Sequence, residues 1–137
     1  SVPNGTGMGR AFKINYLISR QFTIIERKGK TIARVGFAIS VITLAEYLVG
    51  AYKSTSPEKN IHNFENFLNS NDIPVIEIDS NIAYCYAQNL SHLEQRGQKN
   101  SGFDMLIAAT AISKKLILIS DDKAFTRIKE LEIITGV

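Results

Sequence analysis

Several residue types that support particular kinds of protein are rare or missing in this chain. Its 137 residues include one cysteine, two histidines, three prolines and no tryptophan. The single cysteine, Cys85, has no partner for an internal disulfide and forms no Cys-x-x-Cys pair, which excludes disulfide-stapled folds and zinc ribbons. No stretch approaches the roughly 18 uninterrupted apolar residues of a membrane-spanning helix. We therefore expect a cytoplasmic protein from a reducing compartment, with no membrane partner.

What is present is the composition of one globular domain. The chain has a mass of 15.2 kDa and is 45% hydrophobic and 21% charged, and a domain of this size buries roughly two-thirds of its surface. We expect residues 1–9 (SVPNGTGMG) to be a leader outside the fold or disordered, with Met8 as a native start, because they are small and turn-forming. Residues 10–137 are expected to form a single domain.

The charge is unevenly distributed along the chain. Residues 1–36 hold seven basic side chains and one acid, Glu26, a net of +6, whereas the remaining residues hold nine basic and twelve acidic side chains, a net of −3. A basic N-terminal part is compatible with a polyanionic partner. A solvated, basic helix face would give the same count.

Hydrophobic patterning predicts strands that alternate with helices. Strands are expected at 14–18 (INYLI), 37–42 (FAISVI), 74–78, 116–119 (LILI) and 131–134. Helices are expected from Phe22, from Thr43, from Pro57, from Asp79 or Ser80 to about Arg96, over 103–114 and over 122–129. This alternation predicts an α/β fold with a mostly parallel central sheet covered on both faces.

Acidic residues follow the expected strands at the edge where such sheets bind ligands. Glu46 follows FAISVI, Asp121 and Asp122 follow LILIS, and Asp104 opens the apolar helix. Carboxylates that gather at one edge repel each other and call for a cation. An all-oxygen ligand set favours Mg²⁺ or Mn²⁺ over zinc, and such an ion can polarise a phosphoryl oxygen and activate water.

Each acid also has a simpler interpretation as part of a helix start. Thr43-x-x-Glu46 and Ser101-x-x-Asp104 both match the capping box, and Ser120-Asp121-Asp122 suits the first turn of a helix. Taken singly, each acid fits a cap better than a metal ligand. The metal hypothesis rests on their coincidence.

The remaining reactive side chains do not form a catalytic arrangement. His62 and His92 lie thirty residues apart without metal-ligand partners, and Cys85 lies between two tyrosines. We interpret the histidines as surface or half-buried groups and the cysteine as a structural thiol. No nucleophile elbow or phosphate-binding loop is found.

Two stretches, FAISVITLAEYLVGAYKS and SGFDMLIAATAISKKLILISDDKAFTRIKEL, resemble the diagnostic segments of PIN-domain nucleases, in particular VapC-like toxins. The resemblance runs from about Ile14 onward. It implies a three-layer α/β/α PIN-like domain, a metal-dependent endoribonuclease activity on RNA, a frequent homodimer and a cognate antitoxin as protein partner.

The resemblance also implies roles for individual residues. Glu46 and Asp104 match the second and third acids of the family and would bind Mg²⁺ or Mn²⁺. The last acid falls best on Asp122, with Asp121 as the alternative register and Ser120 as the accompanying hydroxyl. Basic side chains near the site would hold the RNA backbone.

The chain departs from the family at the first acid. The family has an Asp directly after its first strand, whereas here INYLI is followed by Ser19 and no acid occurs before Glu26. A true loss of the ligand, a gap in the sequence, or compensation by Ser19 or Glu26 would each account for this. The alternative function is therefore a catalytically silent PIN module that binds RNA or protein.

The aromatic and apolar side chains of the two central helices have two interpretations. They could form a dimer interface or belong to the hydrophobic core. The residues in question are Tyr47, Leu48, Tyr52, Phe64 and Phe67.

Overall fold

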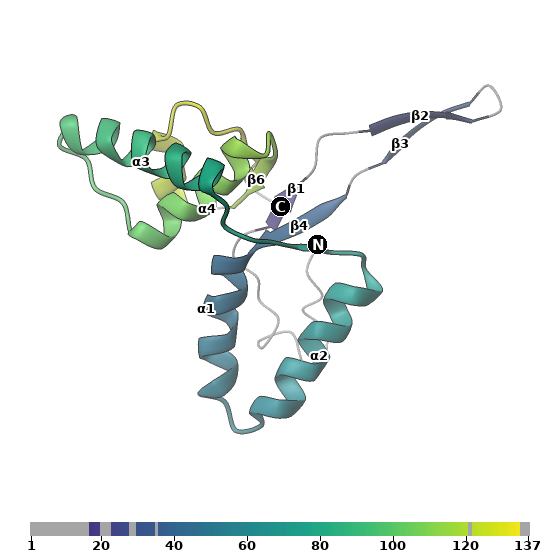
Figure 1. Ribbon diagram of the computed structural model, residues 1–137. Coiled ribbons are helices and arrows are strands. Elements are labelled where there is room, and N and C mark those ends of the chain that lie inside the picture. Colours follow the sequence, from purple (N-terminus) through teal and green to yellow (C-terminus); the bar gives the residue numbers. More distant parts are fainter. Residues whose placement is uncertain (1–16, 20–22, 28–29, 35, 121, 135–137) are drawn as a thin grey trace.

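The computed structural model describes residues 17–19, 23–27, 30–34, 36–120 and 122–134 (Figure 1). The expected leader, residues 1–9, and most of INYLI lie outside these ranges. The elements follow one another as β1 (Leu17–Ser19), β2 (Thr23–Arg27), β3 (Lys30–Arg34), β4 (Phe37–Ser40), α1 (Val41–Tyr52), α2 (Pro57–Ser70), β5 (Val75–Ile76), α3 (Ser80–Gln95), α4 (Gly102–Ser113), β6 (Ile117–Ile119), the 3₁₀ helix η1 (Lys123–Arg127) and β7 (Ile133–Ile134).

Five of the strands form one sheet in the order β5-β4-β1-β6-β7. β4 pairs with β5, and β6 with β7, in parallel, while β1 is antiparallel to both β4 and β6. β4 and β6 therefore run in the same direction, and four of the five strands share it. The sheet is mostly parallel, as predicted, with a reversed strand at its centre.

The reversal of β1 follows from what lies between β1 and β4. We predicted a helix from Phe22, and this prediction is wrong: residues 23–27 and 30–34 are strands, paired from Thr23↔Arg34 to Arg27↔Lys30. Thr23, Ile24 and Ile25 are β-branched and suit a strand. A parallel pair needs a long crossover, usually a helix. Without one, β1 returns to β4 through a long hairpin, whose β2–β3 arm extends away from the helices (Figure 1).

The later elements agree closely with their predicted positions. α2 starts with Pro57 at its first turn, Asp79 caps α3 through a hydrogen bond from the backbone N of Ile82 (2.9 Å), and β7 lies at the sheet edge. Several boundaries differ. α1 begins at Val41 rather than at Thr43, so β4 ends at Ser40, and β5 and β7 are shorter than the strands predicted over 74–78 and 131–134. The predicted helix over 122–129 is a shorter 3₁₀ helix.

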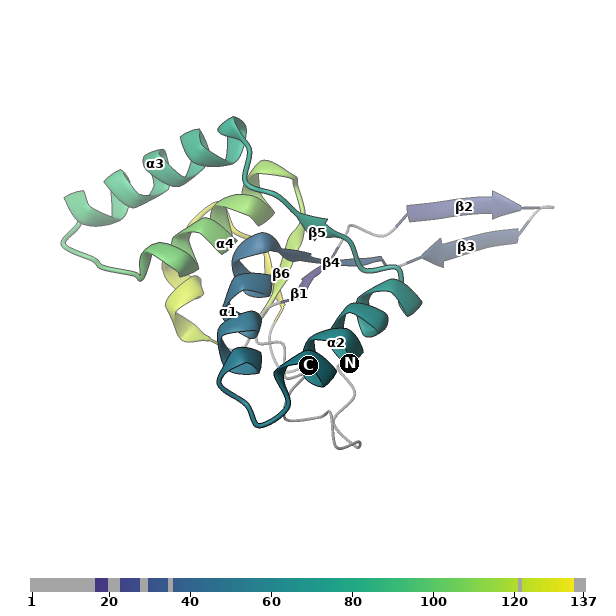
Figure 2. The ribbon, with the colours of Figure 1, turned by 60° about the horizontal axis from the view of Figure 1, so that its bottom comes forward.

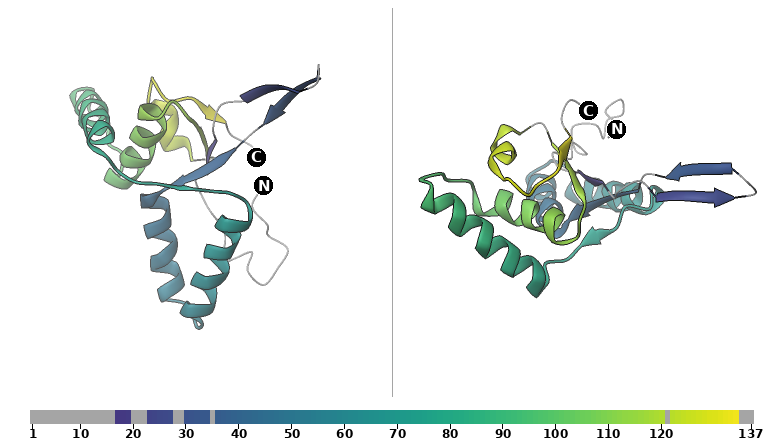
Figure 3. Two further views of the ribbon diagram at one scale, coloured as in Figure 1. Left: turned by 45° about the vertical axis from the view of Figure 1, so that its right-hand side comes forward. Right: turned by 90° about the horizontal axis from the view of Figure 1, so that it is seen from above.

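Two hydrophobic clusters pack around the sheet. The first joins α3, α4, β6 and η1 and includes Leu93, Met105 and Phe125, and the second joins β4, α2 and the facing side of α1. Neighbouring residues of a strand point to opposite faces, and in β5 Val75 packs against the second cluster while Ile76 packs against the first. Helices therefore cover both faces of the sheet, in three layers, as the different views show (Figures 2 and 3).

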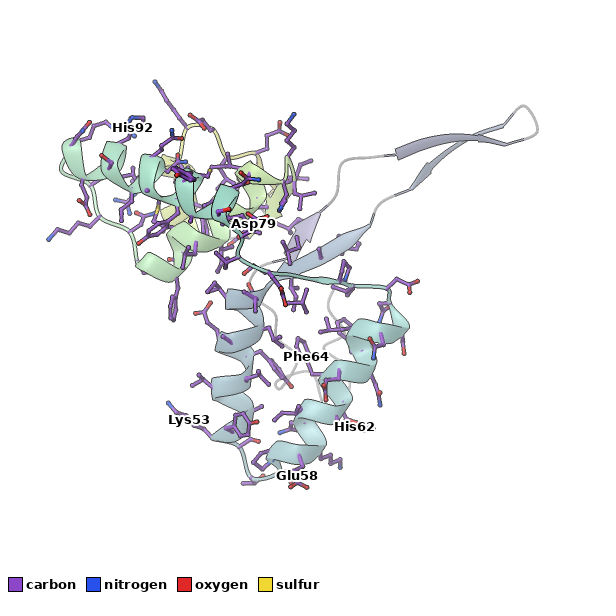
Figure 4. The ribbon with its side chains drawn as sticks, viewed as in Figure 1. Lys53, Glu58, His62, Phe64, Asp79 and His92 are labelled. Atoms are coloured by element: carbon purple, nitrogen blue, oxygen red, sulfur yellow. The ribbon has the colours of Figure 1, made fainter. Side chains whose placement is uncertain are left out.

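The aromatic residues with two interpretations fall mainly in the second cluster. Phe64 is fully buried and stacks on Tyr47, with ring centroids 3.9 Å apart, and it points from α2 toward α1 (Figure 4). Phe67 packs against the same cluster. Leu48 is half-buried and Tyr52 is exposed. The core interpretation is confirmed for Phe64, and Tyr52 remains available at the surface.

An ion pair joins the ends of the two helices in the first cluster. Lys114, just after α4, lies 2.5 Å from the carboxylate of Asp79 at the start of α3. The hydrogen bond from Lys114, followed by that from Ile82, lowers the pKa of Asp79. Among the described residues, no helix is long and apolar enough to span a membrane.

Candidate active site

Glu46 lies on α1, whose start is fixed by Ser40. The buried Ser40 side chain accepts hydrogen bonds from the backbone N atoms of Ile42 (3.1 Å) and Thr43 (3.2 Å), so Ser40 is the N-cap. The predicted capping box of Thr43 with Glu46 is therefore wrong. Glu46 lies beyond the first turn, on the exposed side of the helix. The simpler interpretation of this carboxylate, as a cap, no longer accounts for it.

Asp104 lies in the first turn of α4, where the predicted cap is present. The backbone N of Asp104 donates to the Oγ of Ser101 at 3.0 Å, which makes Ser101 the N-cap. A carboxylate in the first turn also interacts favourably with the helix dipole. The next residues are buried, from Met105 onward, while Asp104 itself is half-buried. The helix thus holds this side chain at the boundary between core and solvent.

The structure brings Glu46 and Asp104 together. α1 and α4 contact each other, and the side chains are close enough to interact electrostatically. Burial raises the pKa of Glu46, and the negative charge of Asp104 raises it further. Two carboxylates from segments 58 positions apart in the sequence therefore share one site, in which their mutual repulsion disfavours the doubly charged state.

The third predicted acid has a structural role of its own. The Oδ1 of Asp122 accepts a hydrogen bond from the backbone N of Ala124 (2.9 Å) and caps η1, as the helix-start interpretation proposed. The Oγ of the buried Ser120 accepts from the backbone N of Asp122 (3.1 Å). Asp121 lies outside the described residues. Ser120 therefore fixes the backbone on which Asp122 is mounted.

Ser19 lies at the end of the sheet where β4 and β6 begin, whereas these acids follow the end where β4 and β6 finish. Because β1 is reversed, Ser19 pairs with Phe37 and Ile117, the first residues of β4 and β6. Glu46, Ser120 and Asp122 all follow the ends of those strands. The backbone register thus separates Ser19 from the Glu46–Asp104 pair.

The pair provides oxygen ligands of the kind that hard divalent cations prefer. In the part of the chain that the structure describes, no three His, Cys, Asp or Glu side chains gather into a metal cluster. Mg²⁺ is commonly bound by only one or two carboxylates together with waters and substrate phosphates. The two carboxylates therefore fit such an ion, provided that water or substrate completes its coordination.

The other titratable side chains considered from the sequence take no part in this pair. His62 and His92 are exposed, as predicted, and His62 contacts the side-chain amide of Asn66 at 3.1 Å. Cys85 is half-buried, and burial, followed by the charge of Glu130, raises the pKa of its thiol. A raised pKa disfavours the thiolate, which agrees with a structural thiol.

Comparison with known proteins first defines the class. The sequence model of the family described as "PIN domain" matches residues 19–131. This range includes β4, β5, β6, the last residue of β1 and all the acids considered above, and it ends before β7.

Individual relatives narrow this class. The "tRNA(fMet)-specific endonuclease VapC" of Salmonella typhimurium is 31% identical over 99 residues, covering 72% of this chain and 70% of the relative. The crystal structure of VapBC2 from Rickettsia felis bound to a promoter DNA fragment matches with a TM-score of 0.66 and 33% identity, over 72% of this chain and 73% of that one. VapBC-5 of Mycobacterium tuberculosis, described as a member of the VapBC family of toxin-antitoxin systems, matches with a TM-score of 0.60 and 27% identity, over 71% and 79% of the two chains. The chain therefore belongs to the PIN-domain family and, within it, to the VapC proteins.

Proposed function

We propose that this protein is the toxin of a toxin–antitoxin pair, an endoribonuclease that hydrolyses RNA phosphodiester bonds with Mg²⁺ or Mn²⁺. The names of its relatives support the nuclease and toxin assignments. The observation that carries the chemistry is the convergence of Glu46 and Asp104: partial burial, followed by the charge of Asp104, raises the pKa of Glu46. A capping role does not explain Glu46, whereas a shared cation explains both side chains.

In this proposal Glu46 and Asp104 hold the cation, directly or through water. Bound there, the ion would polarise a phosphoryl oxygen and lower the pKa of a water molecule. Asp122, or Asp121 in the other register, would orient the attacking water, and Ser120 would support that segment. Basic side chains around the site would bind the RNA backbone without reading its sequence.

The proposed partners are an antitoxin protein and a second copy of the chain, in the cytoplasm. Solved relatives are VapBC assemblies, one of them described as a toxin–antitoxin system. Val49 and Tyr52, both more than half exposed at the end of α1, are apolar side chains that a protein partner would cover. Light scattering measures the mass of the purified chain, alone and with the product of the neighbouring gene. A dimer mass alone supports the second copy, and a larger complex with the neighbouring product supports the antitoxin.

The test of the activity is RNA cleavage by matched carboxylate variants. Asp104→Asn and Glu46→Gln should each lower metal-dependent cleavage by about 100-fold or more, because a bound cation contributes several kcal/mol and about 1.4 kcal/mol corresponds to a factor of ten. Glu58→Gln removes an exposed carboxylate at the other end of the α1–α2 pair (Figure 4) and should leave cleavage unchanged. Unchanged cleavage by Asp104→Asn would refute the proposal.

The second candidate function is RNA or protein binding without catalysis. It is favoured by one observation, that no acid follows β1 and that Ser19 lies at the opposite sheet edge from Glu46. It predicts that the wild-type chain binds RNA but does not cleave it at any Mg²⁺ or Mn²⁺ concentration.

A further inference from the structure

A pocket separate from the Glu46–Asp104 pair lies between the end of α3 and the segment that follows η1. Its volume is about 360 Å³, and it is backed by Leu93 and Ile128, which are almost fully buried. Its other lining side chains are polar or charged: Asn89, His92, Gln95, Arg96, Lys129 and Glu130.

The charges of the pocket favour an anion. Arg96 and Lys129 are exposed cations that come from two different segments and line the same space, with Glu130 as the only acid. Within the described ranges, neither Arg96 nor Lys129 has a carboxylate within the 4.0 Å of an ion pair. The side chains of His92 and Gln95 add N–H donors, whereas the side-chain amide of Asn89 already donates to the carbonyl of Cys85 (2.9 Å). Guanidinium, ammonium and amide groups are the usual ligands of a phosphate.

The end of α3 explains only part of this arrangement. Gly97 has a φ of +71°, and the backbone N of Gln98 donates to the carbonyl of Leu93 (2.9 Å), which closes the helix beside the pocket. Cations near a helix C-terminus also complement its dipole, which accounts for Arg96. Lys129 belongs to no helix, so the dipole does not account for its position.

The 3₁₀ helix η1 leads from Asp122, the third predicted acid, to the pocket. The side-chain amide of Asn100 donates to the carbonyl of Ala124 (2.8 Å), which fixes η1 against the loop between α3 and α4. The five residues of η1, Lys123–Arg127, separate Asp122 from Ile128, a span of about 12 Å at a rise of about 2.0 Å per residue. Lys123 and Arg127 are both exposed along it. Two exposed cations therefore lie on η1, between Asp122 and the pocket.

We infer that this pocket binds a phosphate group, and that in the RNA substrate this is a phosphate of the RNA backbone. The inference rests on the proposed ribonuclease function for the identity of the ligand, but the phosphate site is defined by its own residues.

The first experiment measures RNA binding without cleavage. In the full chain carrying Asp104→Asn, the affinity for a single-stranded RNA is measured by fluorescence anisotropy between about 50 and 300 mM salt. The Debye length falls to less than half over this range, so the electrostatic part of the affinity changes measurably. Lys129→Gln and Arg96→Gln should each weaken binding by about fivefold at 0.1 M salt and reduce the salt slope by about 0.7, the value for one phosphate of a single strand. Glu130→Gln should tighten binding.

The matched control is Lys53→Gln. Lys53 is an exposed lysine at the far end of α1, remote from His92 at the outer end of α3 (Figure 4). This variant has the same change in net charge and should leave both affinity and slope unchanged. Equal effects of Lys53→Gln and Lys129→Gln would overturn the inference, because they would reflect net charge alone.

The second experiment separates the sources of phosphate. Inorganic phosphate and adenosine monophosphate are titrated into the ¹⁵N-labelled chain, and a shift of the Gln95 side-chain amide should appear in the wild type and disappear in Lys129→Gln. Phosphate binding without any effect of Lys129→Gln on RNA would overturn the assignment to RNA. Failure of the wild type to cleave RNA would refute the proposed function. The binding measurements would still decide whether the pocket binds a phosphate group.

Discussion

At the residue scale, the most informative side chain is Glu46. The residue is mostly exposed and makes no cap. Partial burial, followed by the charge of the nearby Asp104, raises the pKa of its carboxyl group. Two like charges held close together cost stability, and proteins retain such arrangements mainly at functional sites. The pair is therefore better explained by what it binds than by what it contributes to folding.

This argument predicts how stability depends on pH. The pKa of Glu46 is higher in the folded than in the unfolded chain, so the folded state binds the proton more tightly and its relative stability falls as pH rises through that range. In protein stripped of divalent ions, Glu46→Gln should therefore have a higher melting temperature than the wild type at pH 7. The difference should shrink as pH is lowered and Glu46 becomes protonated.

Thermal unfolding monitored by circular dichroism at several pH values checks this prediction, with Glu58→Gln as the control. A Glu46→Gln variant that melts below the wild type at pH 7 would show that the carboxylate is stabilised by its surroundings, contrary to the repulsion inferred here.

At the element scale, the hydroxyl of Ser40 decides where α1 begins. Ser40 satisfies two backbone N–H groups that would otherwise be unpaired in a buried position. Thr43, which the sequence pattern suggested as the cap, is buried inside the first turn instead. This start positions Glu46 beyond the first turn and away from any capping role.

Removing this cap should destabilise the protein measurably. Ser40→Ala is expected to lower the free energy of unfolding by about 1 kcal/mol, within the usual range for loss of an N-cap. Ser56→Ala is the matched control, because Ser56 is the N-cap residue of α2 but makes no side-chain capping hydrogen bond. Urea denaturation of both variants compares them, and equal losses would contradict the role of Ser40.

At the scale of the whole molecule, two clusters on opposite faces of one sheet hold the fold together. Phe64 is the largest fully buried side chain of the second cluster, between α2 and α1. Phe64→Ala should lower the free energy of unfolding by about 3–5 kcal/mol, a large part of the total for a domain. Phe103→Ala, at a side chain that is 56% exposed, should cost far less. Chemical denaturation of both variants provides the comparison.

Metal binding should also act on the whole molecule. A ligand that binds only the folded chain stabilises it by about 2.7 kcal/mol at 100 times its dissociation constant. Mg²⁺ or Mn²⁺ should therefore raise the melting temperature of the wild type, and Asp104→Asn should abolish most of that rise. An equal rise in melting temperature in both proteins would show that the ion does not bind at the Glu46–Asp104 pair.

The sequence by itself determined the elements whose signals are local. The apolar runs of β4 and β6, Pro57 at the start of α2 and the caps at Asp79 and Ser101 depend on neighbours within a few positions, and all are found where expected. The resemblance to PIN-domain nucleases was carried by such segments and is confirmed by the family match.

Only the tertiary structure decided the features that depend on distant residues. The direction of β1 is fixed by its pairing with β4 and with β6, which is distant in the sequence, and the helix that we predicted from Phe22 would have implied the opposite direction. The closeness of Glu46 to Asp104, and of Arg96 to Lys129, likewise arises because packing brings separate helices and loops together. Local propensity acts over one or two turns, whereas these arrangements are set by which apolar faces the whole chain can bury at once.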